Sequence, residues 1–199
     1  NNKIKFVPLN EIGSIITGYT PKTSNSSFYG NDIPFFKPKD LNKGYFVNNS
    51  KDKLSTKGIQ KARLVPEKSV LVTSIGATIG KTGFSRIEGV TNQQINSIIP
   101  DSNQILPEFL YFLCISPQFQ ESILNNASST TLPIINKSKF SKLEIPLFSI
   151  KEQEQMVSQI EQGFSLIENT SQIVESTLQN LQTMKMSVLK QAFEGKLVP

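Results

Sequence analysis

The most constraining feature of this sequence is an uninterrupted stretch near its C-terminus. Residues 150–193 contain no proline and a single glycine, Gly163, and these two residue types are the ones that most often break helices. Ser149 followed by Glu152 matches a capping box at the start, while Gly195 and Pro199 supply stop signals at the end. The stretch is therefore predicted to form one helix about 66 Å long.

Apolar side chains recur along this predicted helix at alternating spacings of three and four residues. This spacing is typical of a coiled coil and is sustained over about five heptads. Ser171 and Lys185 interrupt it, and polar residues at such positions fix register or orientation at a cost in stability. We call this row the seam, and its predicted dimer contacts are Val157, Ile160, Phe164, Ile167, Val174, Leu178, Leu181 and Val188.

An apolar row of this length needs a second helix to cover it. Residues 1–149 contain no predicted helix of matching length, so the covering helix is expected to come from another copy of this chain or from a missing part of a longer one. An antiparallel homodimer is our prediction. The alternative, in which the row packs against the chain's own domain, stays open.

Residues 1–149 have a different composition, with short apolar runs separated by Pro, Gly, Asn and Ser. Such punctuation predicts strands, here at residues 33–36, 69–73 and 95–99. Two helices are expected at residues 107–115 and 117–125, each starting at a proline. The predicted fold class is α+β: a mixed α/β domain over residues 1–149, then one long helix within residues 150–199 that forms a coiled coil with a partner helix.

Several classes of site and location are excluded by residue types. Histidine is absent and Cys114, within an apolar run, is the only cysteine, so a Ser-His-Asp triad and a His- or Cys-rich metal site are impossible. No catalytic residue, metal or cofactor is assigned. The sequence lacks an apolar run of about 18 residues and begins without a signal-peptide pattern, which predicts a cytoplasmic protein without membrane contact.

The positive charge is concentrated in one part of the chain. The net charge is +5 overall, but residues 1–149 carry +7 and residues 150–199 carry −2. Nine basic and three acidic residues fall within residues 37–68. Double-stranded DNA, a polyanion, is the natural partner for such a segment; a lysine-rich solvated surface is the plainer alternative.

Polar loops supply the candidate contacts. Residues 76–82 superficially resemble a nucleotide-binding loop, but only three residues separate Gly76 from Gly80, where four are needed. A glycine-rich turn between strands is the better interpretation, and its Thr78 and Lys81 are candidates for DNA contact. Asn92 and Gln93 carry amides that can read adenine or, alternatively, shape a turn. The predicted DNA-binding residues are Lys22, Lys37, Lys39, Lys43, Thr78, Lys81, Asn92 and Gln93.

Taken in order, short motifs along the chain resemble the specificity subunits of Type I restriction–modification systems. The matching stretches are GYTP at 18–21, YG at 29–30, IPF at 33–35, GATIGK at 76–81, TNQQI at 91–95, FLY at 109–111, LP at 132–133 leading to IPL at 145–147, EQ at 154–155 and AFEGKLVP at 192–199. They cover nearly the whole chain.

This resemblance implies a non-catalytic DNA-recognition subunit. Such subunits carry two target-recognition domains, each followed by a long helix, and the helices pair antiparallel to space two half-sites. Modification and restriction subunits bind this core and supply methyl transfer and cleavage. This chain carries one domain and one helix, as in a half-subunit or a C-terminal half. The alternatives are a coiled-coil scaffold without a DNA role and the recognition part of a fused restriction–modification enzyme.

Overall fold

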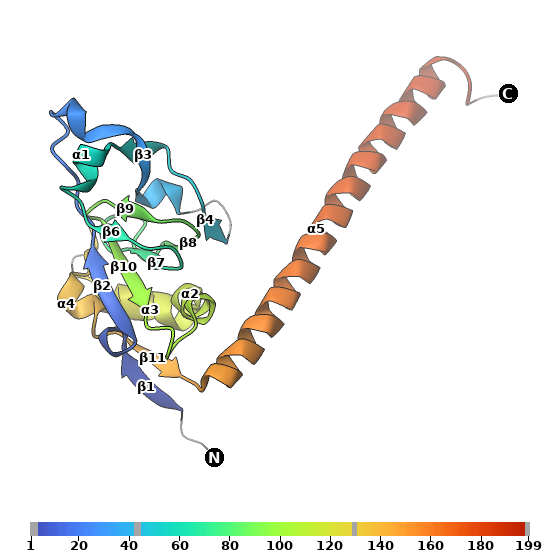
Figure 1. The fold of residues 1–199 in the computed structure, drawn as a ribbon. Coiled ribbons are helices and arrows are strands. Elements are labelled where there is room, and N and C mark those ends of the chain that lie inside the picture. Colours follow the sequence, from blue (N-terminus) through green and yellow to red (C-terminus); the bar gives the residue numbers. More distant parts are fainter. Residues whose placement is uncertain (1–3, 42–44, 129–130, 198–199) are drawn as a thin grey trace. The chain divides into compact units, whose positions relative to one another are not determined.

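The computed structural model describes residues 4–41, 45–128 and 131–197. Its contacts divide the chain into two compact units, Asn1–Gln155 and Met156–Pro199. The first unit is a mixed α/β body and the second consists mainly of helix (Figure 1). The sequence-based domain boundary between residues 149 and 150 coincides with the start of the long helix and remains a prediction as a domain limit.

A five-stranded sheet forms one layer of the first unit. Its antiparallel part runs through β2, β10, β7 and β8, and β4 joins the edge of β8 in parallel. The strands, in sheet order, are β2 (Gly13–Thr17), β10 (Ile95–Pro100), β7 (Val70–Thr73), β8 (Thr82–Ser85) and β4 (Phe46–Val47).

A four-stranded sheet lies beside it, with β3 and β9 paired in parallel at its centre. Its strands, in sheet order, are β5 (Asp52–Leu54), β3 (Tyr29–Phe36), β9 (Gly89–Thr91) and β6 (Leu64–Val65). Phe35 and Phe36 are successive residues of β3, so their side chains point to opposite faces. Phe35 packs with Ile33, Leu54 and Val90, whereas Phe36 packs in a separate cluster that includes Leu71 and Ile95.

The helices of the first unit are short. They are α1 (Thr56–Ile59), α2 (Pro107–Ile115), α3 (Pro117–Asn126) and α4 (Lys137–Phe140), with 3-10 turns at Leu9–Glu11, Ser26–Phe28 and Pro38–Asp40. Proline begins α2 and α3, and the Ser116 side chain accepts from Phe119 N–H to cap α3. Cys114 is buried in α2, and burial raises the pKa of its thiol. The predicted helices at 107–115 and 117–125 are thus confirmed within one residue.

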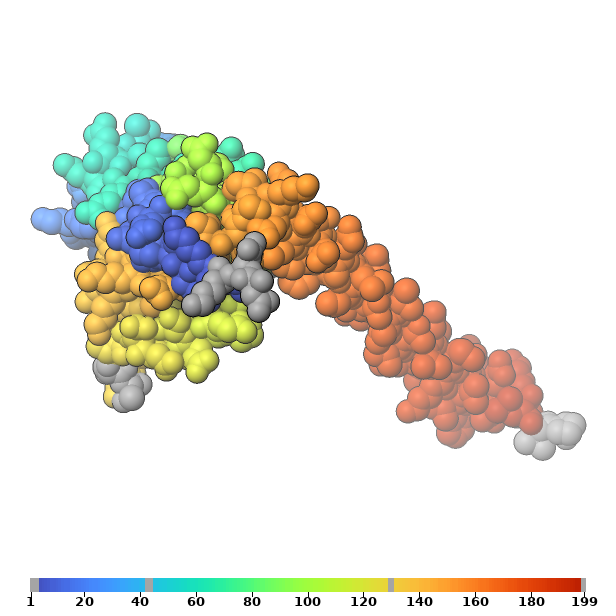
Figure 2. Space-filling model, turned by 90° about the horizontal axis from the view of Figure 1, so that it is seen from below, coloured from blue at the N-terminus to red at the C-terminus, as the bar shows by residue number. Residues whose placement is uncertain are grey.

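The third sheet is a two-stranded antiparallel ribbon of β1 (Lys5–Pro8) and β11 (Glu144–Leu147). It pairs the strand that opens the first unit with the strand that closes it. Figure 2 shows this side of the molecule, with the blue residues of β1 against orange residues near 145. The register joins Phe6 to Pro146 and Val7 to Ile145.

Helix α5 spans Ile150–Phe193, as the sequence predicted. Ser149 N–H donates to the Glu152 carboxylate (2.9 Å) and Glu152 N–H donates back to the Ser149 hydroxyl (3.4 Å), which forms the predicted capping box. At the other end Gly195 has φ +70°, and Lys196 N–H donates to the Gln191 carbonyl (2.9 Å). This is a Schellman C-cap, which needs a residue with positive φ and therefore favours glycine.

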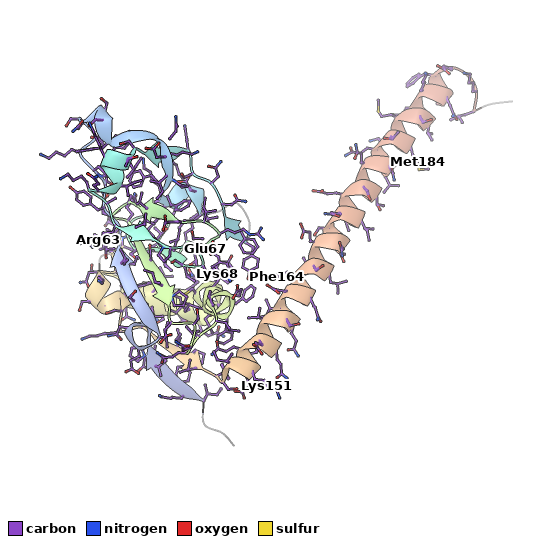
Figure 3. The ribbon with its side chains drawn as sticks, in the orientation of Figure 1. Arg63, Glu67, Lys68, Lys151, Phe164 and Met184 are labelled. Carbon is purple, nitrogen blue, oxygen red and sulfur yellow. The ribbon has the colours of Figure 1, made fainter. Side chains whose placement is uncertain are left out.

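The seam is uncovered along most of α5. Val157 and Ile160 are half-buried, and the large seam residues from Phe164 to Val188 are 47–63% exposed. Phe164 and Met184 mark two levels of the helix in Figure 3. The α+β fold with a long C-terminal helix is therefore confirmed, while the pairing of that helix stays a prediction. None of the helices in the described ranges is long and apolar enough to cross a bilayer.

Candidate nucleic-acid interface

The loop that follows β2, residues 18–25, is held against the turn after β9. Gly18 N–H donates to the Ile95 carbonyl (3.0 Å) and Tyr19 N–H donates to the Thr91 carbonyl (2.9 Å). Gly18 sits so close to this turn that a Cβ would overlap the carbonyl oxygens of Thr91 and Asn92. Glycine is therefore required at position 18 by the close approach of the two backbone segments.

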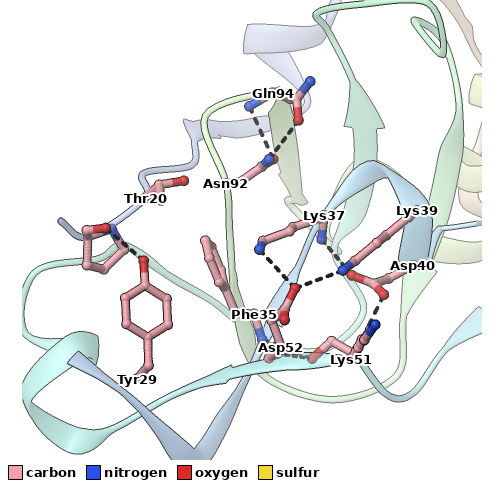
Figure 4. Close-up of polar contacts among 12 residues, drawn as sticks. Thr20, Tyr29, Phe35, Lys37, Lys39, Asp40, Lys51, Asp52, Asn92 and Gln94 are labelled. Carbon is pink, nitrogen blue, oxygen red and sulfur yellow. Dashed lines mark hydrogen bonds and ion pairs between the residues drawn. The ribbon is translucent and has the colours of Figure 1, made fainter. Parts of the chain in front are cut away.

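The turn after β9 contains the predicted amide pair, and only one of the two faces outward. Asn92 is 6% exposed, its Oδ1 accepts from Gln94 N–H (3.2 Å), and its Nδ2 donates to Gln94 Oε1 (2.8 Å; Figure 4). Gln93 is exposed and accepts from the Thr20 hydroxyl. Base contact by Asn92 stays a prediction, and it would require this turn to open, whereas Gln93 is already presented at the surface.

The glycine-rich segment joins β7 to β8 as an antiparallel hairpin, which confirms the turn interpretation. Gly76 and Gly80 have φ values of +101° and +85°, conformations that other residues rarely adopt. Thr78 is exposed at the tip and Lys81 is half-buried. Gln120 of α3 donates to the Gly80 carbonyl (2.8 Å) and so attaches this loop to the helical layer.

Lys37 and Lys39 share one carboxylate. Both ammonium groups contact Asp52 Oδ2, at 2.8 and 2.9 Å, and Lys37 also lies 5.1 Å from the centre of the Phe35 ring. Hydrogen bonds from the two lysines lower the pKa of Asp52 to about 2. Figure 4 shows the three side chains meeting where β3 ends beside β5. Two of the predicted phosphate-binding lysines are thus half-neutralised from within the protein.

A second acidic residue, Asp40, holds the backbone beside Lys37 in place. Asp40 is 3% exposed, and its carboxylate accepts from the backbone N–H groups of Lys37 (2.9 Å) and Lys51 (3.4 Å). Backbone donors of this kind stabilise a buried carboxylate without consuming a lysine side chain. The backbone N–H of Asn92 donates to the Phe36 carbonyl (3.1 Å), so this lysine group adjoins the amide turn.

The remaining predicted contacts are dispersed. Lys22 is exposed on the loop after β2, Lys81 lines a hollow with Leu41 and Gln120 on the helical side, and Lys43 lies outside the described residues. Two further basic residues, Lys61 and Arg63, were not among the predicted contacts. Lys61 lines the same hollow as Lys22, and Arg63 Nη1 donates to the Thr17 carbonyl (3.1 Å). Figure 3 labels Arg63, which lies between α1 and β6.

The first turn of α5 carries a buried anchor that sequence reasoning missed. Gln153 is 0% exposed; its Oε1 accepts from Leu106 N–H (2.8 Å), and its Nε2 donates to the carbonyls of Gln104 (3.0 Å) and Phe148 (2.9 Å). Three backbone groups are satisfied by one side chain. The EQ motif at 154–155, by contrast, is exposed. Burial in a helix is predicted from the spacing of apolar side chains. Because Gln153 is polar, this spacing could not identify it as buried.

The described residues contain no group of three His, Cys, Asp or Glu side chains arranged to hold a metal ion. The candidate site offers lysine ammonium groups, side-chain amides, hydroxyls and backbone groups beside the Asp52 carboxylate. Such groups donate to phosphate oxygens and exchange hydrogen bonds with base edges.

Comparison with known proteins settles the family. The family model described as "Type I restriction modification DNA specificity domain" matches residues 1–178. The chain belongs to this specificity-domain family. Among curated relatives, the specificity subunit of the Haemophilus influenzae Type I restriction enzyme HindI is 41% identical over 140 residues. That of Methanocaldococcus jannaschii MjaIX is 30% identical over 165 residues.

The specificity-domain family is also matched in fold. A chain from a structure of the assembly and conformational transition of the type I R-M system superposes with a TM-score of 0.77 and 22% identity, over 98% of this chain and 47% of that one. The HsdS subunit of Thermoanaerobacter tengcongensis gives a TM-score of 0.70 and 20% identity, over 98% and 46%. The resemblance inferred from the motifs is thereby confirmed.

These specificity subunits are longer than this chain. The matches cover 69% and 81% of this chain but only 30% and 38% of the two curated relatives. This chain therefore corresponds to about a third of the length of the curated relatives and about half of the solved chains.

Proposed function

We propose that this chain is a sequence-recognition half of a Type I specificity subunit. Its first 149 residues read one half of a split DNA target, and helix α5 sets the spacing to a second recognition domain. The chain itself is not catalytic, and modification and restriction subunits in the cytoplasm supply methyl transfer and cleavage. Membership of the specificity-domain family over residues 1–178 is the observation that carries this proposal.

DNA is held in two ways. Lys22, Lys37, Lys39 and Lys81 contact the phosphate backbone, which gives salt-dependent affinity without sequence preference. Exposed polar side chains, Gln93 and Thr78 foremost, contact base edges and give specificity. Support comes from the meeting of the loop after β2 with the amide turn, since exposed polar groups from distant parts of the sequence gather there. Lys43 and Asn92 are retained as candidates.

The second recognition domain is supplied by a second copy of this chain through antiparallel pairing of α5. The exposed seam supports this, because large apolar side chains at heptad spacing are stable in water only when another helix covers them. Two copies also match the length of one solved subunit, of which this chain covers 47%. A two-fold dimer reads a symmetric, interrupted target, because protein symmetry is mirrored in the site.

Selection from a pool of random DNA duplexes tests the recognition role. Repeated binding and amplification should enrich two inverted half-sites separated by a spacer of constant length. Absence of any enriched sequence from the folded protein would contradict sequence recognition and favour the scaffold alternative. Binding of S-adenosylmethionine by the chain alone would instead favour the fused-enzyme alternative.

The seam is tested by light scattering. Leu178→Asp places a charge in the seam and should convert a dimer to a monomer at micromolar concentration. Ser176→Asp introduces the same charge on the face of α5 away from the seam and should leave the dimer intact. A wild-type chain that is monomeric at this concentration would contradict the antiparallel dimer.

A further inference from the structure

A hollow of about 450 Å³ opens between the loop after β2 and the end of α1. Its lining comes from two segments that are distant in sequence, residues 19–28 and Lys61; the lining residues are Tyr19, Pro21, Lys22, Asn25, Phe28 and Lys61. It is distinct from the place where Lys37 and Lys39 meet Asp52.

The hollow carries uncompensated positive charge. Lys22 and Lys61 are its only charged lining residues, and neither forms an ion pair with another residue in the described ranges. Both are exposed. Lys37 and Lys39, in contrast, share the Asp52 carboxylate. Two ammonium groups facing one hollow repel each other, and an anion placed between them removes that repulsion.

The walls of the hollow are fixed before any ligand arrives. Tyr29 donates its hydroxyl to the Pro21 carbonyl (2.8 Å), and Asn25 N–H donates to the Lys22 carbonyl (3.1 Å). Ser55 N–H, at the start of α1, donates to the Phe28 carbonyl (3.0 Å). A loop held in this way loses little conformational freedom on binding, so more of the interaction energy appears as affinity.

The chemistry of the rim matches a nucleotide. Lysine ammonium groups act as point charges toward phosphate oxygens. Tyr19 is 47% exposed beside them and offers its aromatic ring for packing against a deoxyribose of the backbone. The next residue, Thr20, donates to the exposed Gln93, so the hollow adjoins the side chain best placed to contact bases.

We infer that this hollow is a binding site for a DNA backbone phosphate, with Lys22 and Lys61 as its cations and Tyr19 at its rim. The inference rests on the proposed DNA-recognition function and names Lys61 and Tyr19 as further contact residues. The phosphate bound here fixes the register of the duplex, so that Gln93 meets the base edges of the same half-site.

The test measures how duplex binding depends on salt. Fluorescence anisotropy with a labelled duplex of about 30 base pairs is compared for the wild type, Lys22→Ala, Lys61→Ala and the double variant. Each lost phosphate contact lowers the slope of log affinity against log salt by about 0.9. The affinity deficit of each single variant should therefore shrink about 3.5-fold between about 50 and about 200 mM salt, and that of the double variant about 12-fold.

Matched variants identify the source of any change. Lys61→Arg keeps the charge and should keep the wild-type slope, and Lys137→Ala removes an exposed lysine of α4 and should also keep it. If the double variant retains the wild-type slope, the phosphate site is wrong while DNA recognition stands. If the wild type binds no duplex at all, the proposed function itself fails. Thermal melting confirms that each variant is folded, with Lys61→Gln as the replacement should Lys61→Ala unfold.

Discussion

Replacing Asp52 with Asn should lower stability and raise non-specific DNA affinity at the same time. In the folded protein, contacts from Lys37 and Lys39 lower the pKa of Asp52 to about 2, from its usual 3.8. Such a change corresponds to at most about 2.4 kcal/mol. Because the carboxylate is 32% exposed, solvent screening reduces the expected loss to about 1 kcal/mol.

The pH dependence has a definite sign. A carboxyl group whose folded-state pKa is lowered stabilises the protein above its unfolded pKa, near 3.8, and this contribution disappears as the pH falls toward about 2. Urea unfolding followed by circular dichroism should therefore show Asp52→Asn less stable than wild type at pH 7. The gap should close as the pH falls from about 4 toward about 2.

DNA binding should change in the opposite direction. The amide introduced by Asp52→Asn carries no charge, so the two lysines regain the one unit of positive charge that Asp52 neutralises, and the salt slope should steepen by up to about 0.9. Asp32→Asn is the matched control: Asp32 lies on β3, the strand that leads to Lys37, its carboxylate accepts from Thr56, and its replacement removes the same charge. Equal increases in slope for the two variants would refute the idea that Asp52 neutralises part of the charge of Lys37 and Lys39.

Three further substitutions test how the framework is held. Gln153→Ala removes three hydrogen bonds to backbone groups and should cost about 3 kcal/mol in urea unfolding, whereas exposed Gln155→Ala should be nearly neutral; equal losses would refute the anchor. Gly18→Ala forces a Cβ into carbonyl oxygens and should lower the melting temperature and weaken DNA binding. A Cβ at position 163 would meet open space, so Gly163→Ala should stabilise helix α5 by about 0.5–1 kcal/mol. Thermal melting followed by circular dichroism should show a higher melting temperature for this variant.

The parts of the fold that local signals encode were predictable. Helix α5 was predicted from Ile150 to Phe193 because its capping box, its glycine C-cap and the absence of proline all act within a few residues. The hairpin at Gly76 and Gly80 was predictable for the same reason, since positive φ is a local requirement.

The candidate site was less predictable because it depends on pairing between distant strands. Asp52 meets Lys37 and Lys39 only because β5 pairs antiparallel with β3, and no local pattern sets that register. Asn92 carries a side-chain amide of the kind that can contact bases, but it is buried. Its burial follows from the position of β9 beside β3, which the sequence does not show. The sequence identified side chains that could contact DNA. Tertiary contacts determine which of them are exposed, which are buried and which form ion pairs within the protein.

The ribbon of β1 and β11 has a consequence for how such a protein changes over generations. Because the opening and closing strands pair with each other, the chain enters and leaves the first unit at one edge. A gene segment encoding this body has its two junctions adjacent in space, so recombination can exchange the whole body while helix α5 continues from the same point. If the chain recognises DNA as proposed, such an exchange replaces the recognition surface and leaves the length of helix α5 unchanged.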